Sequence, residues 1–146
     1  MSIKDLINDI CKYAIKNNIV DSAIAGLSLY DVNFNQNNIY PLLFVAPSQN
    51  HSIKDSTITY RINLHYIDRL LRDKDNNIDI VSYSTSKLQA LVNIIKGQEN
   101  ILSVNKDFTI YNFTDTQRLT DCVAGSYLTL EITVKNELGD CENIIF

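Results

Sequence analysis

The ten residues from Thr57 to Tyr66 alternate between polar and apolar side chains without interruption, and this alternation constrains the fold more than any other feature of the chain. Successive side chains of a strand point to opposite faces. One face would carry Ile58, Tyr60, Ile62, Leu64 and Tyr66, and the other Thr57, Thr59, Arg61, Asn63 and His65. We therefore predict a long strand with one face on a core and a polar face available to solvent or a neighbouring molecule.

Two further segments have helical periodicity. The first is predicted from Ile3 to about Lys16, with Ser2 as its N-cap and Asp5 reaching back to it. Its apolar positions are Ile3, Leu6, Ile7, Ile10 and Ala14. The second is predicted to begin at a cap formed by Asn76 or Asn77 and to end at Gly97. Its stripe consists of Ile80, Val81, Leu88, Leu91, Val92 and Ile95.

Three more segments have the composition of strands. They are Ile39–Pro47, which is apolar throughout, Phe108–Phe113, and Ala124–Lys135, in which Gly125 is expected to mark a bulge. Residues 19–30 fit either a short strand or a turn, and residues 31–38 a loop. The resulting order α-β-β-α-β-β predicts a single α+β domain spanning residues 1–146. Its sheet would be antiparallel or mixed, of about four strands, with two helices packed on one face.

Composition narrows the function classes. A formal net charge of -4 and a pI near 5.0 argue against a general nucleic-acid binder, which needs clustered Lys and Arg to neutralise phosphates. We expect a protein made in the cytoplasm and not associated with a membrane, because no apolar run approaches the ~18 residues of a membrane span. Cys11, Cys122 and Cys141 have no metal-like spacing and are expected to be inert thiols.

The sequence offers little catalytic or ligand-binding chemistry. Asp73, Asp75, Asn77 and Asp79 place oxygens at alternate positions, as in a calcium-binding loop. However, Ile78 stands where such a loop needs glycine and Ser84 where it needs glutamate, so we expect no metal. His51 and His65 are expected to be surface histidines, and no glycine-rich phosphate loop exists. Tyr60 and Tyr66 are expected to pack on the sheet with their hydroxyls at its edge. No cofactor is predicted.

The whole order of elements resembles the neck, tail-terminator and tail-completion proteins of tailed bacteriophages, which form the head-tail connector. The segments that carry the resemblance cover essentially the full chain. They are the N-terminal helix from Ile3, the strand IYPLLFVAP, the long strand STITYRINLHYIDRL, the helix NIDIVSYSTSKLQALVNIIKG, and the final pair FTIYNF and CVAGSYLTLEITV.

The resemblance implies a non-catalytic structural protein of the virion, located in its neck or tail region. Copies of the chain would form a ring, a hexamer or a dodecamer, between a portal or adaptor ring and the tail. DNA would pass through the ring without sequence-specific binding, which an acidic chain favours.

Charges of both signs follow the long strand and suit contacts between subunits of such a ring, although a surface loop between strand and helix explains them equally well. Tyr83 and Tyr127 are candidate anchors, because tyrosine is enriched at protein interfaces. The predicted subunit interface comprises Asp68, Arg69, Arg72, Asp73, Lys74, Asp75, Tyr83 and Tyr127.

Two other functions stay open. A small cytosolic α+β module that holds a peptide or small ligand along a sheet edge would be a monomer or dimer with a pocket. An enzyme would use His65 with Asp68 or Asp115 and would lose activity in the His65→Ala variant.

Overall fold

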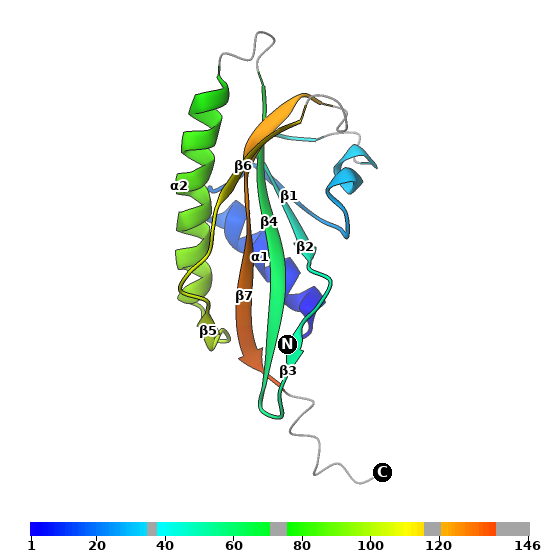
Figure 1. The fold of residues 1–146 in the computed structure, drawn as a ribbon, viewed down its shortest axis with the longest axis vertical. Coiled ribbons are helices and arrows are strands. Elements are labelled where there is room, and N and C mark those ends of the chain that lie inside the picture. The colour runs from blue at the N-terminus through cyan, green and yellow to red at the C-terminus, as the bar shows by residue number, and fades with distance from the viewer. Residues whose placement is uncertain (35–37, 71–75, 116–120, 137–146) are drawn as a thin grey trace.

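Two 13-residue strands, β4 (Thr57–Arg69) and β7 (Val123–Lys135), form the centre of the sheet (Figure 1). They pair antiparallel in unbroken register, from Thr57 opposite Lys135 to Arg69 opposite Val123. The structure is a computed structural model that describes residues 1–34, 38–70, 76–115 and 121–136. The alternation of Thr57–Tyr66 thus produces the predicted strand, with its apolar side chains on one face.

Shorter strands complete the sheet on both sides of this pair. The order is β1 (Ser22–Ala25), β2 (Leu42–Pro47), β4, β7 and β5 (Ser103–Val104), while β3 (Ser52–Ile53) pairs with β4 and β6 (Tyr111–Asp115) with β7. The β1–β2 pair is parallel and the other pairs are antiparallel, so the sheet is mixed. The described part of the chain has seven strands instead of about four, and the α-β-β-α-β-β order was wrong. The strands β1, β3 and β5 have four, two and two residues, too few to show a period of two.

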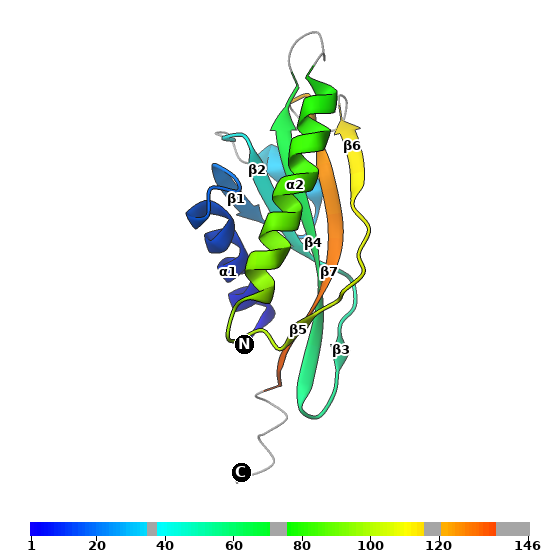
Figure 2. The same cartoon turned by 90° about the vertical axis from the view of Figure 1, so that its left-hand side faces the viewer.

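Two helices, α1 (Ile3–Lys16) and α2 (Asn77–Lys96), cover one face of the sheet (Figure 2). The capping box of α1 is present: the N–H of Asp5 donates to Ser2 Oγ at 3.1 Å, and the N–H of Ser2 to Asp5 Oδ2 at 3.4 Å. Asn76 occupies the N-cap position of α2 but does not cap it with its side chain; its Nδ2 donates instead to the carbonyl oxygen of Arg69 at 3.3 Å. Both helices begin and end where the sequence predicted, although the side-chain cap expected for α2 is not formed.

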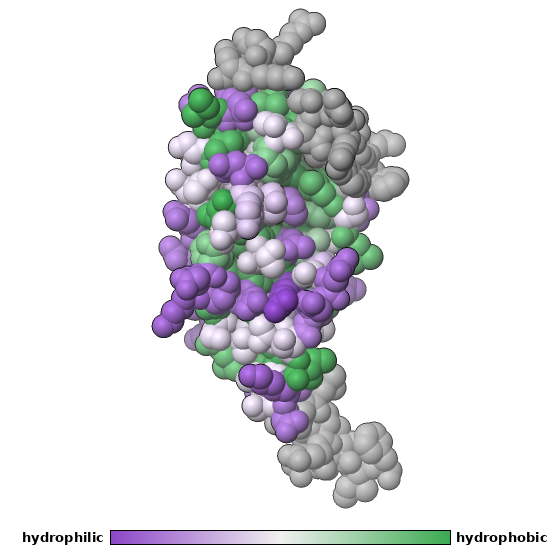
Figure 3. All heavy atoms as spheres, viewed as in Figure 1, coloured by the Kyte–Doolittle hydropathy of each residue, from purple (hydrophilic) through white to green (hydrophobic). Residues whose placement is uncertain are grey.

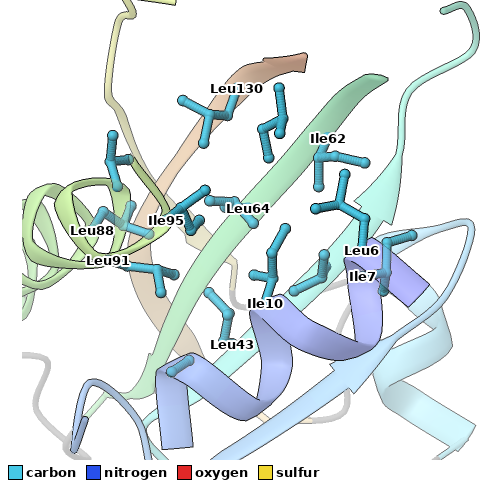
Figure 4. Close-up of a cluster of buried hydrophobic side chains, with 14 of the residues drawn as sticks. Leu6, Ile7, Ile10, Leu43, Ile62, Leu64, Leu88, Leu91, Ile95 and Leu130 are labelled. Carbon is cyan, nitrogen blue, oxygen red and sulfur yellow. The ribbon is translucent and has the colours of Figure 1, made fainter. Parts of the chain in front are cut away.

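The main core lies between the helices and the sheet (Figure 4). Leu6 and Ile10 of α1 and Leu91 and Ile95 of α2 meet the apolar face of the central strands, and all four are at most 1% exposed. The sheet contributes mainly Leu43, Val45, Ile62, Leu64, Leu128, Leu130, Ile132 and Val134. A smaller apolar cluster lies at one end of the opposite face, where a 3-10 helix, η1 (Leu29–Phe34), places Val32 against Phe44 and Ile67.

Two residues within this sheet differ from expectation. Tyr66 does not bring its hydroxyl to the sheet edge: the oxygen is buried without a hydrogen-bond partner among the described residues, whereas the Tyr60 hydroxyl donates to the carbonyl oxygen of Met1 at 3.2 Å. Gly125 marks no bulge, because it lies opposite Ile67 in continuous register. A Cβ atom there would lie 1.7 Å from the carbonyl oxygen of Tyr66, so the glycine permits close approach of the two backbones.

Candidate functional site

The face of the sheet opposite the helices carries cross-strand pairs of polar side chains. The hydroxyls of Thr59 and Thr133 lie 2.8 Å apart, and Thr129 Oγ1 donates to Asn63 Oδ1 at 2.7 Å. Between these pairs, Arg61 Nε lies 3.2 Å from Glu131 Oε1. We call this surface the open face and define it as Thr59, Arg61, Asn63, His65, Tyr127, Thr129, Glu131 and Thr133. Hydrophilic side chains form a band across it in Figure 3.

The pairing neutralises the charges of the open face within the chain. Arg61 also donates to Asn50 Oδ1 at 3.1 Å, and its backbone N–H donates to His51 Nδ1 at 3.2 Å. Each side chain of the Arg61–Glu131 pair remains about 40% exposed, at 41% and 42%. Such a surface is polar and held in place by its own hydrogen bonds, and it offers a partner little free charge.

Beyond the Asn63–Thr129 pair, the open face carries aromatic rings. His65 stacks on Tyr127 with ring centroids 5.1 Å apart, and Tyr127 stacks on Tyr111 at 5.2 Å. Phe44 and Phe113 meet the His65 ring edge to face at 6.0 and 6.1 Å. We call Phe44, His65, Tyr111, Phe113 and Tyr127 the aromatic cluster. It brings together four strands, β2, β4, β6 and β7.

His65 is therefore half-buried among aromatic rings, and not freely exposed as the expectation of a surface histidine had it. Burial lowers its pKa to about 4, and its Nδ1 atom has no hydrogen-bond partner among the described residues. A group with this pKa is uncharged and a weak base at neutral pH. The alternation of β4 also places Asp68 on the other face of the sheet, so the structure does not bring His65 and Asp68 together. The side chain of Asp115 lies outside the described residues.

A groove borders the open face on the side of β5 and β6. It has a volume of about 420 Å³, and its lining includes Arg61, Thr129 and Glu131 of the open face. Asn105 and Asp107 line its wall together with Tyr111, which is 54% exposed. Sequence reasoning did not identify Asn105, Asp107 or Tyr111 as neighbours of Arg61, because they meet it only through the pairing of β5 and β6 with β7.

The predicted interface residues that the structure describes lie on both sides of the sheet. Asp68 and Arg69 end β4 and point to opposite faces. Tyr83 is 58% exposed on α2, with the Lys87 ammonium 5.2 Å from its ring centroid, whereas Tyr127 belongs to the aromatic cluster on the other side of the sheet. The remaining four, Arg72, Asp73, Lys74 and Asp75, lie outside the described residues.

Arg69 is fixed by contacts within its own chain. Its guanidinium donates to Asp121 Oδ1 at 3.0 Å and lies over the ring of Tyr40, 5.4 Å from the centroid. The Tyr40 hydroxyl donates to the other oxygen of Asp121 at 2.7 Å. Burial, and then this hydrogen bond, raise the pKa of Tyr40 to about 12. Burial likewise raises the pKa of Asp68. These contacts join the end of β4 to the start of β7.

Other candidate chemistry can be located only in part. Asn77 and Asp79 lie in the first turn of α2, while Asp73 and Asp75 of the calcium-like pattern are outside the described residues. Within the described ranges, no three His, Cys, Asp or Glu side chains are grouped so as to hold a metal ion. Burial raises the pKa of the Cys11 thiol to about 11. No helix in the described part of the chain is both long and apolar enough to cross a membrane.

No protein-family model matches the chain, and the search of curated proteins found no match.

Proposed function

We propose that the chain is a structural subunit of a ring in the neck or tail connector of a tailed bacteriophage. The observation that carries the proposal is the one-sided sheet. Its two 13-residue central strands have helices on one face and a polar face whose charges are paired within the chain. Such a sheet is a stiff wall, and a wall with little free charge suits a passage through which DNA slides.

The two edges of the sheet are formed by different strands and supply two unlike surfaces. Among the described residues, β1 pairs only with β2, and β6 pairs only with β7, so each presents one unpaired edge. Contacts between unlike surfaces of identical subunits are head-to-tail and close into a ring when the rotation permits. The partners we propose are copies of the chain, as a hexamer or dodecamer, with portal, adaptor or tail proteins above and below.

Particle mass and symmetry test this proposal. Purified protein would be measured by mass photometry and imaged by negative-stain microscopy, alone and in a phage that carries it. We expect a cyclic hexamer or dodecamer, or a ring in the neck or tail connector of the particle. A chain that stays monomeric in solution and that antibody labelling does not locate in the connector would contradict the proposal.

The groove beside the open face favours a second candidate function, a module that binds a small ligand or peptide. The exposed Tyr111 ring and the polar side chains of Asn105 and Asp107 could hold a polar molecule. We would test it by thermal-shift screening of sugars and short peptides. This function would be favoured over the ring if the protein is a monomer that binds one of these compounds and if Tyr111→Ala abolishes the binding.

A further inference from the structure

The sheet extends past the ends of both helices at the end where the N-terminus lies (Figures 1 and 2). Beside the part of the helix-facing surface that lies beyond the helices is a cavity of about 460 Å³, which we call the basal groove. Its lining is largely apolar and includes Met1, Ile3, Ile58 and Tyr60. A second cavity, of about 530 Å³, shares Met1 and Lys135 with it and contains the acidic residues Asp5 and Glu99. Of the two, the basal groove is the one suited to apolar side chains.

The residue that follows β7 lies in this groove. Asn136, the residue after β7, lines the groove and is 5% exposed. Its N–H donates to the carbonyl oxygen of Ser56 at 3.0 Å, and its side-chain amide donates to that of Lys54 at 2.8 Å. These two hydrogen bonds fix the point from which residues 137–146 continue.

Residues 137–146 have the composition to occupy the groove. They read ELGDCENIIF and finish with three apolar residues, Ile144, Ile145 and Phe146. The seven residues 137–143 that separate this group from Asn136 would span about 15 Å as a flexible chain, enough to return to a cavity that Asn136 itself lines. Tethering at so short a distance gives a high effective concentration, which favours the chain's own segment over that of another molecule.

We propose that Ile144, Ile145 and Phe146 bind in the basal groove of the same chain, against Ile3, Ile58 and Tyr60. This contact would remove from water the apolar surface of Ile3 and Tyr60, which are half-buried, together with that of the three apolar residues. The proposal does not depend on the assembly of a ring and can hold for a monomer.

The absence of tryptophan from the sequence provides a direct test. In Phe146→Trp, a single tryptophan reports on its surroundings. We expect its emission at shorter wavelength than in the urea-unfolded chain, together with reduced quenching by acrylamide. Both effects should be independent of protein concentration, because the contact is intramolecular.

Two variants in the Phe146→Trp background test each side of the contact. Ile3→Asp places a charge in the groove, in the first turn of α1 where the helix dipole favours an acidic residue, so the helix should be kept. Ile145→Asp alters the segment and no residue of the groove. In both we expect the emission to move to the wavelength of the unfolded chain while circular dichroism stays native. Ile78→Asp is the matched control, since Ile78 lies in the first turn of α2 and is 82% exposed.

Three results would overturn the proposal. The first is emission from Phe146→Trp that equals that of the unfolded chain. The second is a short-wavelength emission that Ile3→Asp or Ile145→Asp leaves unchanged. The third is a shift that grows with protein concentration, which would assign the groove to the segment of a second copy.

Discussion

His65 belongs to the polar face of β4, yet three aromatic rings contact it and leave it half-buried. Phe44, Phe113 and Tyr127 lie within 6.1 Å of its ring centroid, measured between centroids. Burial disfavours the charged imidazolium and lowers the pKa from 6.5 to about 4. The folded state therefore binds fewer protons at this residue than the unfolded state between these two pH values. The stability that neutral His65 provides is complete above pH 6.5 and is lost as the pH falls towards 4.

We predict that His65→Phe makes the protein less sensitive to acid. The gap between pKa 6.5 and about 4 corresponds to on the order of 3 kcal/mol in the free energy of unfolding. Phenylalanine is chosen because it suits the aromatic surroundings. Urea unfolding of the wild type and the variant between pH 7 and 4 measures how the free energy of unfolding depends on pH. We expect the wild type to lose about this much more stability than the variant. Equal losses in the two proteins would show that His65 is not buried in its neutral form.

At the scale of elements, the contact between β4 and β7 determines the strength of the sheet. The two strands pair along their whole length, and the backbones approach closely at Gly125, where a Cβ atom would meet the Tyr66 carbonyl oxygen. Neither side can yield easily, because Tyr66 is 1% exposed in the main core. The contact therefore requires glycine.

We predict that Gly125→Ala destabilises the protein by about 3 kcal/mol or more, because the added methyl group forces the two backbones apart. Chemical denaturation measures the loss. Gly97→Ala is the matched control: Gly97 has a φ of -81°, and the nearest atom to an added Cβ is 3.6 Å away, so its effect should stay within about 1 kcal/mol. Similar stabilities for the two variants would argue against the close approach.

At the scale of the whole molecule, assembly needs exposed anchor residues that the fold itself does not use. Tyr127 is a poor candidate, because its ring already stacks on His65 and Tyr111. Tyr83 is 58% exposed on the outer side of α2 and can contact a neighbouring subunit without disturbing the core. Among the predicted interface residues that the structure describes, it is the one best suited to separate assembly from folding.

We predict that Tyr83→Asp weakens the ring while the subunit stays folded. Loss of a buried aromatic anchor costs about 2 kcal/mol per contact, which raises the dissociation constant about 30-fold. Mass photometry over a dilution series measures the change. Ser86→Asp adds the same charge to an exposed position of the same helix and should have a smaller effect. If Tyr83→Asp assembles as well as the wild type, Tyr83 lies outside the interface.

The long helices and strands, in which apolar residues recur at a regular spacing, were predictable. The period of two between Thr57 and Tyr66 predicted which side chains of β4 face the helices, and the stripe from Leu6 to Ala14 predicted the buried face of α1. Both signals come from residues a few positions apart, whose relative directions the backbone geometry determines. The α+β class, with two helices on one face of an antiparallel or mixed sheet, was predicted from these elements, and the sheet is mixed.

Pairing between distant segments decided the rest. The sequence by itself placed His65 on the polar face, but its burial depends on Phe44, Phe113 and Tyr127, which only the tertiary pairing of four strands brings to it. The same holds for the contact of Arg69 with Asp121, 52 residues away, and for the approach of Gly125 to Tyr66. A local pattern specifies the direction of a side chain, whereas its environment depends on which strands become neighbours, and no period along the chain encodes that choice.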